Sequence, residues 1–267
     1  AMFSSKKKTG FSKFVASIPN WAWLIISLVT ALLLWVVISH TKKGGVVFAT
    51  PPEVLESLIK QASSGLLWDH VSHSLFRVIA GFSLAFVAAI PVSFLMGWYA
   101  PFRHVVEPWI QFVRNIPPLA YIPLIIVAAG VGEPSKVIVI FIACFLVLVV
   151  TIYQGVCNVD VTLIKAARIL GASDRDIFFR VVIPASTPFI LTGARLGLSA
   201  ALTTLVAAEL TGASEGLGMM IQKASGYYDM GTVLMGIIVI GIIGISMEKL
   251  VRFLERRLTG WQETVQQ

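Results

Sequence analysis

The stretch KAARILGASDRDIFFRVVIP, residues 165–184, is rich in charged side chains, whereas the chain on either side of it is almost entirely apolar. The run before it, VIVIFIACFLVLVVTIY (137–153), contains no charged side chain and is long enough to cross a lipid bilayer as a helix. Charged side chains are costly inside lipid. The contrast therefore predicts a membrane protein in which a polar loop joins two membrane spans.

The composition of the whole chain supports this class. Of the 267 residues, 57% are hydrophobic and 13% are charged, and the mean hydropathy is +0.84. Soluble domains carry about 25% charged residues. The apolar runs predict an all-α fold with about six transmembrane helices, each near the length a bilayer requires. They are expected at 21–39, 75–98, 106–129, 136–154, 183–208 and 231–251.

The distribution of Lys and Arg predicts the orientation, because cytoplasmic segments carry an excess of these residues. With the amino terminus in the cytoplasm, the cytoplasmic segments hold Lys6, Lys7, Lys8, Lys13, Arg103, Lys165, Arg168, Arg175, Arg180, Lys249, Arg252, Arg256 and Arg257. The outer segments, including one span mouth, hold Lys42, Lys43, Lys60, Arg77, Lys136 and Lys223. We therefore expect both termini and the 165–184 stretch to lie in the cytoplasm. The first apolar run is too long for a cleaved signal peptide and is expected to stay as an anchor.

Motifs of enzymes are absent from the sequence. It contains no nucleophile elbow, phosphate-cradling glycine loop or zinc motif. Cys144 and Cys157 have no ligand spacing and are expected to be small packing residues. We expect no catalytic residue, metal or cofactor in this chain, so any ATP that drives it must be bound by another protein.

The polar loop itself has the pattern of two short helices. Apolar residues recur at helical spacing on one face of the first, namely Leu163, Ala166, Ala167 and Leu170. Asp160 can cap its start, and Gly171 can end it in a left-handed conformation. Ser173 and Asp176 fit a capping box at the start of a second helix through about Arg180, and Pro184 suits the start of the next span. The pattern alone leaves open whether these helices cover the protein's own underside or receive another protein.

The loop resembles the signature loop of permease subunits of binding-protein-dependent ABC importers. The matching positions are Ala166, Ala167, Gly171, Val181, Ile183 and Pro184, whereas Lys165 stands where glutamate is usual. The segments 114–136, 188–210, 216–225 and 255–261 also look like importers of the taurine, aliphatic-sulfonate, nitrate and bicarbonate group. The likeness covers most of residues 68–261 and is closest to taurine and sulfonate permeases.

This resemblance implies a type I ABC importer permease fold in the bacterial inner membrane. Residues 1–67 would form a cytoplasmic tail, an anchor helix and an outer connection; 68–257 the transmembrane core; and 258–267 a cytoplasmic tail. It also implies a homodimer of this permease, or a pseudo-symmetric pair with a relative. Two ATPase subunits that bind ATP and Mg and a soluble or lipid-anchored substrate-binding protein would complete the complex. Loop 160–184 would dock on the ATPases through Lys165, Ala166, Ala167, Arg168, Gly171, Ala172, Ser173, Asp174 and Pro184.

Candidate pathway residues lie where polar groups or helix breaks fall within the spans. Proline at Pro117 interrupts the third span after Arg114 and Asn115, and broken helices often line transport pathways. Arg114 would favour an anion, and Arg195 either lines the pathway or pairs structurally. Glu209 is placed at the outer rim, where it would gate the pathway or contact the binding protein.

The leading function is import of small anions, sulfonates first. Import of nitrate, bicarbonate or a heterocyclic nutrient remains an alternative within the same group. An ion-driven secondary transporter would need intramembrane carboxylates, which lie only at or near span ends, and a scaffold would not need a broken span.

Overall fold

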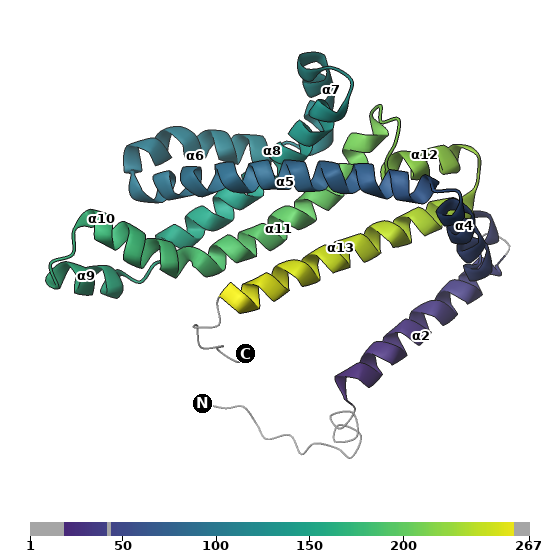
Figure 1. Ribbon diagram of the computed structural model, residues 1–267, viewed down its shortest axis with the longest axis horizontal. Helices are drawn as coiled ribbons and strands as arrows, with labels where there is room; N and C mark the ends of the chain where they lie inside the picture. The colour runs from purple at the N-terminus through teal and green to yellow at the C-terminus, as the bar shows by residue number, and fades with distance from the viewer. Residues whose placement is uncertain (1–18, 42–43, 259–267) are drawn as a thin grey trace.

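The computed structural model describes residues 19–41 and 44–258 (Figure 1). The basic amino-terminal tail, Lys42 and Lys43, and residues 259–267 lie outside the described residues. Within the described ranges all regular structure is helical. Five helices are long and apolar enough to cross a membrane, and a bent helix pair can count as a sixth span. The prediction of an all-α membrane protein with about six spans is therefore confirmed.

Three long helices form the core of the bundle. They are α5 (Leu66–Trp98), α8 (Glu133–Cys157) and α11 (Ile183–Leu210), and α8 packs against both of the others. Fully buried side chains of α8, including Ile140, Leu148 and Ile152, fill the space between them. At Gly155 the backbones come so close that an added Cβ would lie 2.3 Å from the Phe189 Cβ atom of α11. Small residues thus permit close helix contact, as is common inside membranes.

The predicted break in the third span divides it into two helices. The helix α6 (Ala100–Arg114) and the helix α7 (Pro118–Ala129) meet at 105°. Pro117 and Pro118 lack the N–H groups that would continue the ladder of α6. The bend turns α7 away from the direction of α6 (Figure 1), and α7 packs against α8.

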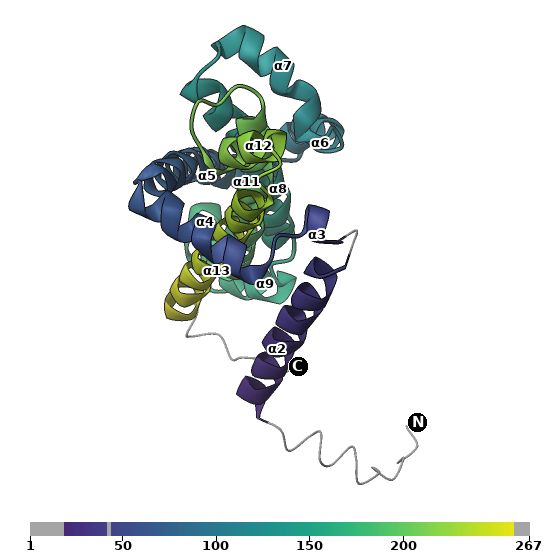
Figure 2. The same cartoon turned by 90° about the vertical axis from the view of Figure 1, so that its right-hand side faces the viewer.

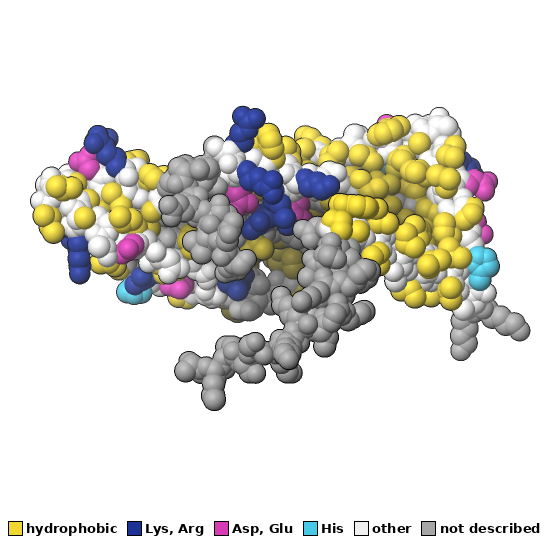
Figure 3. All heavy atoms as spheres, turned by 90° about the horizontal axis from the view of Figure 1, so that it is seen from below, with side chains coloured by type: hydrophobic (Ala, Val, Ile, Leu, Met, Phe, Trp, Pro, Cys, Tyr) yellow, Lys and Arg dark blue, Asp and Glu magenta, His cyan; other side chains and the backbone are white. Residues whose placement is uncertain are grey.

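The remaining long helices surround this core less closely. They are α2 (Asn20–Ser39) and α13 (Met230–Leu258), together with the shorter α3 (Gly44–Val47), α4 (Pro51–Ser63) and α12 (Leu217–Gly226). Helix α2 stands apart from the bundle (Figure 2), and its large apolar side chains are exposed. Hydrophobic side chains also cover much of the face seen from below, while Lys and Arg gather in patches (Figure 3). Such apolar exposure suits a lipid environment.

The polar loop forms the two predicted helices at one end of the bundle, opposite α4 and α12 (Figure 1). They are α9 (Val161–Ile169) and α10 (Asp174–Ile177), and a π-helical turn, η1 (Phe178–Val182), follows directly. The second helix was expected to end near Arg180, with a new span beginning at Pro184. Instead, α10, η1 and α11 form one continuous helical segment. The wider π turn, in which the Ile183 N–H bonds to the Phe178 carbonyl, leads into Pro184 without a break.

Candidate functional site: a cavity in the bundle and the polar loop

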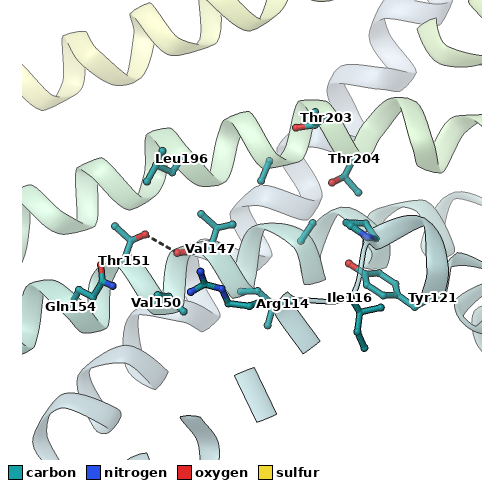
Figure 4. Close-up of a pocket in the computed structure, with 14 residues that line it drawn as sticks. Arg114, Ile116, Tyr121, Val147, Val150, Thr151, Gln154, Leu196, Thr203 and Thr204 are labelled. Atoms are coloured by element: carbon teal, nitrogen blue, oxygen red, sulfur yellow. Dashed lines mark hydrogen bonds between the residues drawn. The ribbon is translucent and has the colours of Figure 1, made fainter. Parts of the chain in front are cut away.

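A cavity of about 560 Å³ lies beside the junction of α6 and α7, between α8 and α11 (Figure 4). Its wall contains the 14 residues Arg114, Ile116, Pro118, Tyr121, Ala143, Leu146, Val147, Val150, Thr151, Gln154, Leu196, Ala200, Thr203 and Thr204. Arg114 lies in the cavity wall because the proline break ends α6 at this residue.

Among the described residues, Arg114 is the single charged one in this wall. No ion pair or hydrogen bond joins its guanidinium to another of the described residues. Hydroxyl and amide groups of Thr151, Thr203, Thr204 and Gln154 supply further polar atoms from α8 and α11. Thr151 and Thr203 donate their hydroxyl protons to the Val147 and Ser199 carbonyls, so Gln154 and Thr204 are the neutral donors left among these four. Because the described wall residues include one cation and no carboxylate, the cavity can accept a small anion and disfavours a cation.

The other predicted pathway residues lie outside the cavity wall. Asn115 turns its side-chain amide back to the Gln111 carbonyl at 2.6 Å, and Pro117 caps α7. The Arg195 side chain is 33% exposed and its Nη1 atom lies 3.6 Å from Glu255 Oε2, so it joins α11 to α13. This geometry agrees with the structural alternative for Arg195, and the pathway roles of these residues stay predictions.

Glu209 occupies the end of α11, as expected, but its side chain is not on a rim. It is fully buried and accepts hydrogen bonds from Ser74, Arg77 and the Gly218 N–H. The placement at a rim was wrong because the sequence could not show that a cation from another helix neutralises this carboxylate.

Arg77 was counted among the outer cations at a span mouth, and its true environment was missed. It lies inside α5 with no exposed surface and binds both Glu133 and Glu209. The available signal was the combination of a lone Arg in a long apolar helix with carboxylates near the ends of two other spans.

The polar loop shows the caps that its sequence predicts. The Asp160 carboxylate accepts the Thr162 N–H at 2.7 Å, and this backbone hydrogen bond lowers the pKa of the Asp160 carboxyl. Gly171 has φ of 82°, the left-handed conformation that ends α9. Ser173 Oγ accepts the Asp176 N–H at 3.2 Å and caps α10. These local features are confirmed.

The face that α9 turns to the bundle differs from the expected one. Ile164 and Ala167 pack against the core, whereas Leu163 is 51% and Leu170 87% exposed. Leu170 and the neighbouring Ile169, which is 86% exposed, leave an apolar tip uncovered in this chain. Such exposed aliphatic side chains often mark a protein contact.

A salt bridge fixes the two short helices relative to each other. Arg168 Nη2 lies 3.1 Å from Asp174 Oδ1 across the Gly171 turn. Both side chains are exposed, so the pair contributes little stability and mainly orients the helices. Lys165 is also exposed on α9 and has no hydrogen bond or ion pair with another described residue.

Comparisons with known proteins agree with this architecture. Residues 81–260 match the family described as binding-protein-dependent transport system inner membrane component. A probable ABC transporter permease protein of Brucella abortus (strain 2308) is 52% identical over 223 residues, which is 84% of this chain and 89% of that protein. The taurine transport system permease protein TauC of Escherichia coli (strain K12) is 37% identical over 261 residues, which is 92% of this chain and 95% of TauC.

A solved structure has the same fold. A chain of the MetNI methionine ABC transporter, in an inward-facing conformation, superposes with a TM-score of 0.61 at 19% identity and covers 74% of this chain and 97% of that one. The family match spans more than half of the sequence and agrees with the helical membrane core. The chain therefore belongs to the binding-protein-dependent ABC importer permeases and is a multi-pass permease subunit of the inner membrane.

Proposed function

We propose that this chain is the permease subunit of an ATP-driven importer of small molecules that carry an anionic group, with taurine, a zwitterion that carries a sulfonate, or another sulfonate as the first candidate cargo. The observation that carries the proposal is the cavity in which Arg114 is the single charged wall residue. A sulfonate has a permanent negative charge and several acceptor oxygens. The guanidinium of Arg114, with the side-chain amide of Gln154 and the hydroxyl of Thr204, can donate hydrogen bonds to such a group.

The substrate class is supported further by the similarity to the taurine permease TauC. Nitrate or bicarbonate would meet the same cavity chemistry, so the wall alone does not separate them from sulfonates. A substrate-binding protein on the outer side would make that choice before the cargo enters the cavity. Two permease copies in the membrane would complete the pathway.

Coupling to ATP hydrolysis is assigned to the loop of α9 and α10. Its exposed apolar tip at Ile169 and Leu170 and its rigid turn at Gly171 suit docking into a groove on a separate ATPase. ATP-bound and nucleotide-free ATPases would hold the loop in different positions. The permease would then respond as a two-state element whose balance is set by its partner's differential affinity.

Reconstitution tests the proposal directly. The chain is placed in proteoliposomes with its cognate ATPase and binding protein, and uptake of radiolabelled taurine is followed with and without ATP. We expect uptake that requires ATP and the binding protein and that other sulfonates inhibit. ATP-dependent uptake of a cargo without an anionic group, with none of any sulfonate or other anion, would contradict the assignment.

A substitution in the loop tests the coupling. Leu170→Asp places a carboxylate on the exposed apolar tip of the loop and disturbs no core contact of this chain, so we expect the permease to remain folded while uptake is lost. The matched control is Ser225→Asp on α12, an exposed position at the other end of the bundle. Equal ATP-driven uptake by Leu170→Asp and the parent would argue against docking through this loop.

A further inference from the structure

The Arg77 cluster, defined as Ser74, Arg77, Glu133 and Glu209, joins three helices at the end of the bundle opposite α9 and α10. Arg77 Nε and Nη2 bind the two carboxylate oxygens of Glu133 at 2.6 and 2.5 Å. Its Nη1 atom binds Glu209 Oε1 at 2.6 Å and the Glu215 carbonyl at 2.8 Å. One buried guanidinium therefore connects α5 to α8, to α11 and to the loop before α12.

The same cluster holds the first turn of α12. Three consecutive backbone N–H groups that begin this helix bond to side chains of other helices. Gly216 donates to His70 Nδ1 at 3.0 Å, Leu217 to Ser74 Oγ at 2.9 Å and Gly218 to Glu209 Oε2 at 2.7 Å. The negative charge of Glu209 also suits the positive end of a helix dipole. The position of α12 thus depends on polar contacts from α5 and α11.

The backbone at the start of α12 lies so close to the cluster that Gly216 and Gly218 have no room for a Cβ atom. A Cβ atom on Gly216, whose φ is 135°, would lie 2.4 Å from Glu209 Oε1 and 2.6 Å from Arg77 Nη1. A Cβ on Gly218 would lie 3.0 Å from Glu209 Oε2 and 3.2 Å from the backbone of Val206. Such close contacts define one seated position of α12 and exclude a gradual slide along the cluster.

The pairing also shows where the cluster can separate. Arg77 and Glu133 form a two-point, neutral pair between α5 and α8 that does not involve α12. If α12 leaves, Arg77 keeps both Glu133 and Glu209 as ion-pair partners, so no unpaired charge is left in the buried cluster, which would be very costly. The contacts that can open without isolating a charge are therefore the hydrogen bonds from the cluster to the Glu215 carbonyl and to the Leu217 and Gly218 N–H groups.

The cluster is close to the cavity along α11. Thr204 lines the cavity and Glu209 lies five residues later, about 8 Å along the helix axis. A change at Glu209 therefore acts about one and a half turns from the cavity wall.

We propose that the Arg77 cluster is a positioning device of the transport cycle: it seats α12 at this end of the bundle, and breaking of its hydrogen bonds to the start of α12, with the ion pairs of Arg77 kept, releases α12. This inference rests on the proposed transport function, in which the two ends of the pathway open in turn. Arg77 and Glu209 act through α12 and are positioning residues, not cargo ligands.

The substitution Glu209→Gln tests this device, because glutamine keeps the shape and one acceptor oxygen but removes the charge that pairs with Arg77. Amide hydrogen exchange of segment 211–226 is compared between the parent and the variant in liposomes. Loss of one charge-assisted hydrogen bond is expected to speed exchange of the first turn of α12 by about tenfold or more. Glu248→Gln is the matched control, since it removes an exposed carboxylate that pairs with Arg252 on α13.

A second measurement, the ratio of cargo imported to ATP hydrolysed, separates a role of the cluster in the transport cycle from a purely structural role. We expect Glu209→Gln, assembled with its ATPase, to hydrolyse ATP faster without binding protein and to import less cargo for each ATP hydrolysed. Faster exchange with an unchanged ratio of cargo to ATP, or no change in exchange, would overturn the proposal. Should Glu209→Gln fail to fold, Ser74→Ala removes one contact to Glu209 and one to Leu217, and the same outcomes apply.

The two proposals fail in different ways. If the unmodified complex shows no ATP-driven uptake of any anion, the transport function is wrong. In that case the exchange rates still decide whether the cluster seats α12, because they do not depend on cargo.

Discussion

Replacing Arg114 by Gln tests the anion pathway most directly. The substitution removes the one charge of the cavity wall and keeps a long polar side chain in its place. Glutamine can still donate a hydrogen bond, so the change isolates the charge. Arg114 has no ion-pair partner among the described residues, so no carboxylate is stranded when the charge is lost.

The size of the effect follows from Coulomb's law. Two opposite charges 4 Å apart attract by about 1 kcal/mol in water and by about 4 kcal/mol near a protein surface. The cavity is open and Arg114 is exposed, so the value belongs to the lower half of this range. A loss of about 1–2 kcal/mol corresponds to a decrease of about 5–30-fold in the affinity of the cavity for an anion.

The assay is the initial rate of ATP-driven taurine uptake in proteoliposomes with the cognate ATPase and binding protein. We expect Arg114→Gln to lower this rate by about the factor derived from the charge interaction, while assembly with the ATPase is unchanged. Added salt should reduce uptake by the parent more than uptake by the variant, because it screens the attraction.

Arg195→Gln is the matched control, because its guanidinium faces Glu255 on α13 and does not line the cavity. An exposed or half-exposed pair of this kind contributes about 0–1 kcal/mol. Its loss should change uptake little and should not alter the salt dependence. Unchanged uptake by Arg114→Gln, or an equal loss in both variants, would refute the reasoning that the charge of Arg114 serves the pathway.

Three further predictions concern packing and the loop. Gly155→Ala should lower the free energy of unfolding by about 1–3 kcal/mol, because the added Cβ overlaps the facing phenylalanine of α11. The control Gly241→Ala should leave the free energy of unfolding unchanged, because its Cβ meets no atom within 4 Å. Thermal unfolding in detergent measures both variants. Gly171→Val should strain the left-handed turn by about 1–2 kcal/mol and reduce the amount of cargo taken up per ATP hydrolysed. Gly171→Asn should retain this ratio, because asparagine tolerates the left-handed conformation. An equal ratio in the two variants would argue against a required turn geometry. A maleimide should modify exposed Cys157 in the folded protein and buried Cys144 only after denaturation, and mass spectrometry measures both reactions. Modification of Cys144 in the folded protein would contradict the packing around α8.

The broken third span shows how far local reasoning reaches. Pro117 and Pro118 predicted an interruption after Arg114, since proline cannot donate the hydrogen bond that a helix needs. The 105° bend, and the cavity that it opens between α8 and α11, depend on how α7 packs against helices that are distant in sequence. A sequence pattern carries no information on that angle.

The charged residues give the opposite lesson. Glu209 and Arg77 were assigned separately, one to a rim and one to a span mouth, although they lie in direct contact. They are separated by 132 positions in the chain. Only the packing of α5 against α11 brings the two side chains together. Their charges need a partner because burial removes them from water, which is costly for an unpaired charge.

The sequence by itself determined the membrane class, the approximate spans and the caps of the polar loop. Each of these depends on apolar length, helical periodicity or a conformational preference within a few neighbouring residues, as at Asp160 and Gly171. The tertiary structure decided which face of α9 is covered, where the cavity lies and how Arg77 joins α5, α8, α11 and the loop before α12. Those features arise from contacts between distant segments, whose pairing is set by the packing of whole helices and not by any local pattern.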